Sequence, residues 1–222
     1  MPTTVILNAD SGAGPAIAER FRADGHSVTT VSQADNARAS LAQILRTAAP
    51  NGVDVLVNNA PILPTSLVSE SSVDEFAASI DIGVNAVFSA CREAAILALD
   101  TGTRLSVVNI VSVLGESALA GTASAACVSS AVIAVTKAFA IEWGTHGFKV
   151  SAVMVGPSGS DGGTEASLPT FPGYRPLGNP IEPGEVAAAV AFLAGPESPS
   201  VTGQALVVDA GWLAYGWHRG GP

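Results

Sequence analysis

The chain has 222 residues, of which 48% are hydrophobic and 13% are charged, and its formal net charge is −9 at pH 7. This length suits one α/β domain with a full core and is short for two. The negative charge disfavours nucleic acid and anionic membranes as partners, because both bind basic patches. The apolar fraction exceeds what a monomer easily buries, so we expect an oligomer interface.

Targeting and metal-binding signals are not evident. The chain enters an apolar, strand-like run at Thr4 without the basic segment that precedes a secretory signal. The most apolar stretch is interrupted by Lys137 and Glu142, which argues against a membrane span. The two cysteines, Cys91 and Cys127, have no metal-ligand spacing and provide no disulfide framework. We therefore expect a cytoplasmic protein without a metal.

Short apolar runs alternate with helical patterns along the chain, which predicts a parallel sheet covered by helices on both faces. The predicted strands are Thr4–Leu7, Ser27–Val31, Val53–Asn58, Leu105–Val111, Lys149–Val155 and Ala205–Val208. The predicted helices are Pro15–Ala23, Ala37–Ala48, Val73–Asp100, Ser124–Trp143 and Pro183–Ala194. The expected fold is α/β: a Rossmann-like, doubly wound sheet of about six strands in a single domain, residues 1–222.

Two irregular stretches follow the later strands. Residues 156–180 are rich in proline and glycine, and a long loop after a strand of an open α/β sheet is a candidate lid over a ligand. The tail, residues 212–222, contains Trp212, Tyr215 and Trp217. Because a free tail has no need of two tryptophans, we expect it to dock on a neighbouring subunit.

Several segments carry a family resemblance in the right order. Gly12 and Gly14 lie in the turn after the first predicted strand, Asn58, Asn59 and Ala60 end the third, and Ser112 ends the fourth. Further on, segments 175–187 and 201–211 lead into the last predicted strand and its following turn. Together they resemble the short-chain dehydrogenase/reductase (SDR) family over nearly the whole chain.

The resemblance implies hydride transfer with NAD or NADP. It implies that Gly12, Gly14, Asn58 and Ala60 contact the cofactor and that Ser112 is the family's catalytic serine. The family's other catalytic groups are a tyrosine, which donates or takes a proton, and a lysine, which lowers the pKa of that tyrosine.

Those other groups are replaced in this chain. Counting from Ser112, and independently back from Lys137 and Glu142, places the tyrosine position at Ala125 and the lysine position at Ser129. Gly83 stands where the family has a helix asparagine. Ser112 is thus the only retained catalytic position, and Tyr174, in the lid-like loop, is a candidate substitute acid. Ser129 and its neighbour are expected to be packing residues.

The cofactor region departs from the family as well. Asn8 replaces the first glycine of the turn, although asparagine tolerates positive φ. Asp10 brings a carboxylate beside the expected pyrophosphate site, at a cost of roughly 1–4 kcal/mol at close range. The N-terminus of the following helix favours an anion and opposes this cost.

A deletion affects the adenine side. About twenty residues separate Ser32 from Val53, which is enough for one helix but not for the additional edge strand and helix of the family. No acidic residue closes the second predicted strand to hold a ribose 2′-hydroxyl. We therefore expect no bound cofactor, with impaired binding of NAD or NADP as the alternative.

Three functions remain open on these residues. The one we favour is a non-catalytic, structural or regulatory subunit that assembles with an active SDR partner or with itself. The second is an NAD(P)-dependent SDR oxidoreductase with relocated catalytic residues. The third is a non-redox lyase, isomerase or dehalogenase. Halohydrin dehalogenases, which resemble the reductases, use the nucleotide pocket for a leaving anion, but they have a tyrosine and an arginine that this chain lacks.

Overall fold

The computed structural model describes residues 1–38, 41–59, 61, 63, 65–156 and 175–215. Its six strands form one parallel sheet in the order β2-β1-β3-β4-β5-β6, which confirms the predicted doubly wound fold. The strands are β1 (Thr3–Leu7), β2 (Ser27–Val31), β3 (Val55–Asn58), β4 (Ser106–Ser112), β5 (Lys149–Val155) and β6 (Ala205–Val208). In the described part of the chain, no strand lies beyond β2, so the expected loss of an edge strand is confirmed.

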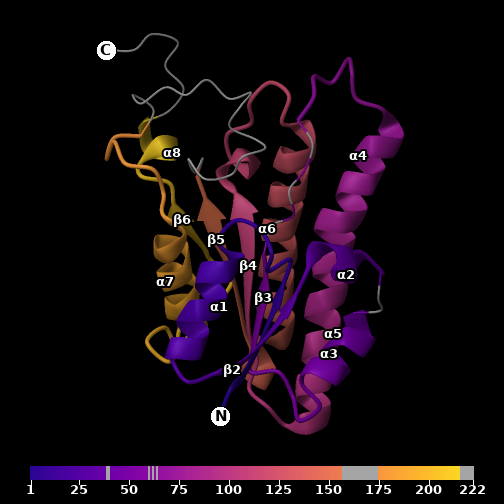
Figure 1. The fold of residues 1–222 in the computed structure, drawn as a ribbon, viewed down its shortest axis with the longest axis vertical. Helices are drawn as coiled ribbons and strands as arrows, with labels where there is room; N and C mark the ends of the chain where they lie inside the picture. The colour runs from indigo at the N-terminus through magenta and orange to yellow at the C-terminus, as the bar shows by residue number, and fades with distance from the viewer. Residues whose placement is uncertain (39–40, 60, 62, 64, 157–174, 216–222) are drawn as a thin grey trace.

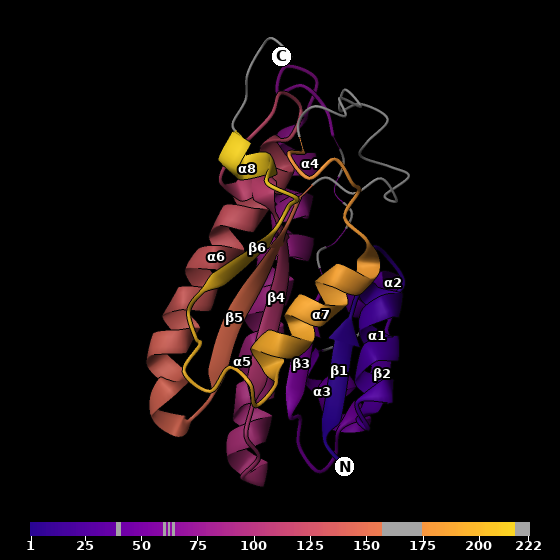
Figure 2. The ribbon, with the colours of Figure 1, turned by 90° about the vertical axis from the view of Figure 1, so that its left-hand side faces the viewer.

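Helices cover both faces of this sheet (Figures 1 and 2). They are α1 (Gly14–Ala23), α2 (Gln33–Arg38), α3 (Leu41–Ala48), α4 (Val73–Ile80), α5 (Ala86–Thr101), α6 (Ala123–Trp143), α7 (Pro183–Ala194) and α8 (Trp212–Tyr215). Helices α1 and α7 pack side by side on one face, and α3 and α5 lie on the other (Figure 1). All strands point the same way, so their carboxyl ends form one edge of the sheet.

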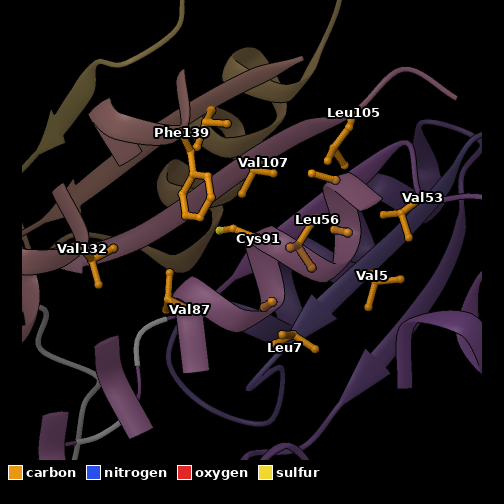
Figure 3. Close-up of a cluster of buried hydrophobic side chains, with 14 of the residues drawn as sticks. Val5, Leu7, Val53, Leu56, Val87, Cys91, Leu105, Val107, Val132 and Phe139 are labelled. Atoms are coloured by element: carbon orange, nitrogen blue, oxygen red, sulfur yellow. The ribbon is translucent and has the colours of Figure 1, made fainter. Parts of the chain in front are cut away.

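Each face of the sheet has its own apolar core, because successive strand residues point to opposite faces. In β1, Val5 and Leu7 contribute to the core beneath α5 and α6, whereas Ile6 contributes to the core beneath α1 and α7. Figure 3 shows the first core, where Phe139 of α6 and Cys91 of α5 approach Leu56 and Val107 of the sheet. This burial on both faces explains why the four central strands, β1, β3, β4 and β5, are largely apolar runs.

Two helical stretches, Val73–Thr101 and Ala123–His146, are long and apolar enough to cross a membrane by length and composition. Both cover the sheet, and residues such as Ala94 and Val132 are buried against it. Their apolar character is therefore that of core helices. Their outer surfaces nevertheless expose Phe88, Leu99 and Ile141.

One helix prediction was wrong in extent. The predicted helix Ala37–Ala48 is replaced by α2 and α3. The chain becomes helical sooner because the Ser32 hydroxyl accepts the Asp35 N–H at 3.1 Å and caps α2. The predicted helix Val73–Asp100 is present and ends one residue later, at Thr101, with a π-helical segment, Asp81–Asn85, between α4 and α5.

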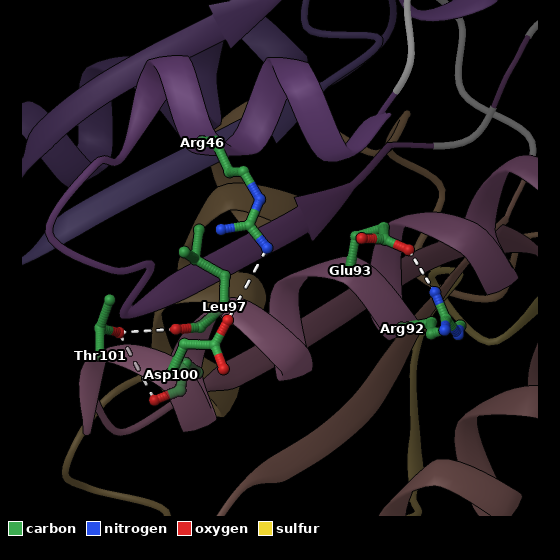
Figure 4. A network of polar contacts seen from close by, with 7 residues as sticks. Arg46, Arg92, Glu93, Leu97, Asp100 and Thr101 are labelled. Atoms are coloured by element: carbon green, nitrogen blue, oxygen red, sulfur yellow. Dashed lines mark hydrogen bonds and ion pairs between the residues drawn. The ribbon is translucent and has the colours of Figure 1, made fainter.

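Helix α3 is attached to α5 mainly by apolar contact. Figure 4 shows the polar part of this junction, an Arg46–Asp100 ion pair with its charged atoms 3.7 Å apart. Both side chains are more than half exposed, so the pair contributes little to stability. Leu45, only 1% exposed, supplies the buried contact instead.

Candidate active site

The turn after β1 is narrow and left-handed. Asn8 and Gly12 both have φ of 53°, so asparagine does adopt the positive φ that sequence analysis expects of it. Gly14 begins α1, and a Cβ built there would lie 2.5 Å from the carbonyl oxygen of Ala9. A side chain at Gly14 would therefore force α1 away from the turn. The close packing of α1 against this turn is therefore kept despite the replaced glycine.

Two asparagines fasten this turn to the end of β3. The Asn8 side-chain amide donates to the Asn59 carbonyl at 3.0 Å, and the Asn59 side-chain amide donates to the Asn8 carbonyl at 2.9 Å. The same amide also donates to the Ser11 carbonyl at 2.9 Å. Both asparagines are buried, so these bonds are shielded from water. The strand order reverses between β1 and β3, because β2 lies on one side of β1 whereas β3 and the later strands lie on the other. In doubly wound folds, ligands bind at this point.

Asp10 lies on the β2 side of this turn. Its Oδ1 accepts the backbone N–H of Gln33, the first residue of α2, at 2.9 Å. The neighbouring Ala9 N–H donates to the carbonyl of Val31, the last residue of β2, at 3.0 Å. The Asp10 carboxylate is thus fixed beside the end of β2, although it belongs to the loop after β1.

Asn58 points into the core. Its side chain is 3% exposed, and its amide donates to Asn109 Oδ1 at 2.7 Å and to Cys91 Sγ at 3.4 Å. The Asn109 amide continues the chain to Thr136 Oγ1 at 2.9 Å. Burial raises the pKa of the Cys91 thiol to about 12. Any contact of Asn58 with a ligand would therefore use its backbone, whereas its side chain joins β3, β4 and α5.

Ser112 ends β4 beside α6. Its N–H donates to Ser129 Oγ at 3.1 Å, and its own Oγ accepts the Leu114 N–H at 3.2 Å. Ser130 Oγ donates to the Gly115 carbonyl at 2.7 Å. Ser129 and Ser130 thus fasten the turn after β4 to α6, in keeping with the expected packing role. The structure brings Ser112 and Ser129 together.

Apolar side chains fill the space beside this turn. Ala125, half-buried on α6, packs against the core, and Val128 is 5% exposed. A Cβ built on Gly83 would lie 2.4 and 2.8 Å from the two Val128 methyl groups. Val128 therefore occupies the position of a side chain at Gly83. This contact was not predicted from the sequence, although a glycine inside an apolar helix is a signal of close packing.

Several predicted site residues lie outside the described residues. They are Ala60, Tyr174, most of the lid-like loop and the end of the tail. Their roles stay predictions. In the described part of the tail, Trp212 and Leu213 pack against the core of their own chain.

Comparison with known proteins agrees with this geometry. A family model described as enoyl-(acyl carrier protein) reductase matches residues 31–213. The chain is 30% identical to 2,5-dichloro-2,5-cyclohexadiene-1,4-diol dehydrogenase of Sphingobium indicum over 95% of its length and 91% of the relative. It is 33% identical to (2S)-[(R)-hydroxy(phenyl)methyl]succinyl-CoA dehydrogenase subunit BbsC of Thauera aromatica, over 95% and 84%. A solved oxidoreductase of the short chain dehydrogenase/reductase family from Burkholderia thailandensis superposes with a TM-score of 0.85 at 26% identity, covering 96% of this chain and 93% of that one.

The chain belongs to the SDR family. The alignment with the Sphingobium SDR relative spans 233 positions, more than the 222 residues of this chain, so that relative contains residues that this SDR protein lacks. Between β2 and β3 the described residues of this SDR protein hold α2 and α3 and no further strand. The SDR relatives named here are dehydrogenases or a dehydrogenase subunit by their names.

Proposed function

We propose that this chain is a cytoplasmic, nicotinamide-dependent oxidoreductase of the SDR family whose proton-transfer group lies at neither Ala125 nor Ser129. The observation that carries the proposal is the intact turn after β1, with left-handed φ at Asn8 and Gly12 and close approach of α1 at Gly14. The dehydrogenases and reductases among its relatives, similar along nearly the full chain, support it.

The residues of the turn suit a dinucleotide. The start of α1 and the backbone at Gly12 would hold the pyrophosphate, because a helix N-terminus carries partial positive charge. The bonds of Asn59 to Asn8 and Ser11 would keep this turn in shape before the ligand arrives. The nicotinamide, when bound, supplies the hydride chemistry.

Ser112 is the residue suited to a substrate carbonyl. Its oxygen accepts the Leu114 N–H, so its hydroxyl hydrogen can be donated to a carbonyl oxygen beside β4. Ala125 has no ionisable proton, and Ser129 is only 4% exposed, so its hydroxyl is shielded from a substrate. The proton must therefore come from another group, and Tyr174 is our candidate for it.

The test is a fluorescence titration with NADH and NADPH, followed by turnover with a panel of ketones. We expect saturable binding in the micromolar range, and a loss of turnover without loss of binding in Ser112→Ala and Tyr174→Phe. Absence of saturable binding up to millimolar dinucleotide would refute the proposal.

A second function, a non-catalytic subunit that assembles with an active SDR partner or with itself, is favoured by the residues around α6. Small or apolar side chains occupy the positions of the family's tyrosine, lysine and helix asparagine, and Val128 fills the space at Gly83. One relative is itself named as a dehydrogenase subunit. The exposed Phe88 and Ile141 would supply an apolar interface.

Co-expression with an SDR protein encoded next to it, followed by native mass spectrometry, distinguishes the two functions. A hetero-oligomer in which only the partner's active-site variants abolish turnover would favour the subunit. Turnover by a homo-oligomer of this chain alone would refute it.

A further inference from the structure

The Asp10 carboxylate is positioned by one of its two oxygens. Oδ1 accepts the Gln33 N–H at 2.9 Å, and the side chain is otherwise exposed to solvent. The bond ties the loop after β1 to the first residue of α2, next to the end of β2. The second oxygen, Oδ2, retains its acceptor positions on the solvent side.

The position at the end of the second strand has a defined role in a doubly wound sheet. When a pyrophosphate lies at the first helix, an acidic residue following the second strand hydrogen-bonds the 2′-hydroxyl of the adenosine ribose. Here β2 is followed by Ser32 and Gln33, neither of which is acidic. The nearby Asp35 has its Oδ2 engaged by the Ser32 hydroxyl at 2.7 Å, as part of the cap of α2.

We propose that Asp10 hydrogen-bonds the adenosine ribose from the loop after β1 and makes this chain selective for NAD(H) over NADP(H). The inference rests on the proposed dinucleotide-dependent function. The Gln33 N–H fixes the carboxylate in advance, so its free oxygen can accept a hydrogen bond from the ribose 2′-hydroxyl. A 2′-phosphate in the same place would bring further negative charge against Asp10 and would be rejected.

The hydrogen bond from the Gln33 N–H to Asp10 also reduces the repulsion between the Asp10 carboxylate and a nearby pyrophosphate. The Asp10 carboxylate is drawn towards α2, whose first N–H partly balances its charge. Asp10, although it lies in the turn after β1, would then contact the ribose next to β2, the edge strand of the sheet.

The test compares the dissociation constants of NADH and NADPH, measured by calorimetry, in wild-type protein, Asp10→Asn and Asp35→Asn. Asp10→Asn keeps an oxygen for the Gln33 N–H but removes the charge. Asp35→Asn is the matched control, because it removes one carboxylate from the same surface. Far-ultraviolet circular dichroism and a thermal melt confirm folding of each variant.

We expect wild type to bind NADH at least about tenfold more tightly than NADPH, a ratio typical of one charged hydrogen bond. In Asp10→Asn the ratio should fall close to one, and in Asp35→Asn it should not change. Equal affinities in wild type, or an unchanged ratio in Asp10→Asn, would overturn the assignment of Asp10 and leave the proposed function intact.

Three other results also decide the question. Loss of the preference in Asp35→Asn alone would assign the role to Asp35 and overturn the proposal. Binding by Asp10→Asn but not by wild type would show that the carboxylate repels the dinucleotide, which would also overturn it. Failure of all three proteins to bind either dinucleotide would refute the proposed function, and this inference with it.

Discussion

Replacing Gly83 by alanine should destabilise the junction between the π-helical segment and α6. The new Cβ would lie 2.4 and 2.8 Å from the methyl groups of Val128, well inside van der Waals contact. Val128 cannot easily turn away, because a β-branched side chain in a helix has one strongly preferred rotamer. Helix α6 or the π-helical segment would have to shift.

The magnitude follows from two opposing effects. Overpacking a tight core costs about 1–3 kcal/mol. Alanine in place of glycine inside a helical segment gains about 0.5–1 kcal/mol. The cost of the clash exceeds the gain in helix propensity, so we expect Gly83→Ala to lower the free energy of unfolding by about 0.5–2 kcal/mol.

Shortening Val128 should remove most of this cost. In a Val128→Ala background the two methyl groups are gone and the new Cβ would meet only the Cβ at position 128, at 3.2 Å, so Gly83→Ala should change the free energy of unfolding by less than about 0.5 kcal/mol. Urea unfolding followed by circular dichroism on the four proteins of this double-mutant cycle gives both values. Stabilisation by Gly83→Ala in the wild-type background would refute the reasoning, since it would mean that Val128 does not occupy this space.

Three further predictions concern single residues. Ala210 has φ of 53°, and Ala210→Gly should raise the free energy of unfolding by about 1 kcal/mol, measured by urea denaturation; a loss of stability would contradict the strain. In a native thiol titration at neutral pH, Cys127 should react and Cys91 should not, because Cys91 is buried and its pKa is raised to about 12; two fast thiols would be inconsistent with that burial. Hydrogen bonds from the Ser72 backbone and side chain lower the pKa of Glu75. The difference in the free energy of unfolding between wild type and Glu75→Gln should therefore be fully present above the ordinary carboxyl pKa, and it should disappear as the pH falls through the lowered pKa of Glu75. A difference that grows as the pH falls would contradict this prediction.

The sheet could be predicted because each strand is indicated by the pattern of its own residues. Each buried strand is a short apolar run, and the predicted bounds of Ser27–Val31, Lys149–Val155 and Ala205–Val208 are those observed. The missing edge strand followed from the short connection between Ser32 and Val53, compared with the extra strand and helix of the family. The early start of α2 was missed, although Ser32 and Asp35 form a recognisable cap.

The site was less predictable because its contacts join distant segments. Nothing near Gly83 shows that Val128 will face it, and nothing near Asp10 identifies Gln33 as its partner. Asn58 resembled a ligand residue, but its side chain is used inside the core by Asn109 and Cys91. Sequence patterns therefore indicated which positions matter and could not say which atoms they meet.

The paired amide bonds between Asn8 and Asn59 also restrict how this protein can move. They lie at the carboxyl ends of β1 and β3, which also pair with each other along the sheet, and they join the loops that follow these two strands. Separating these loops would expose two buried amides and break three hydrogen bonds at once, at a cost of about 1–3 kcal/mol for each group left unpaired. The loop after β1 and the end of β3 therefore form one rigid unit at the carboxyl edge of the sheet.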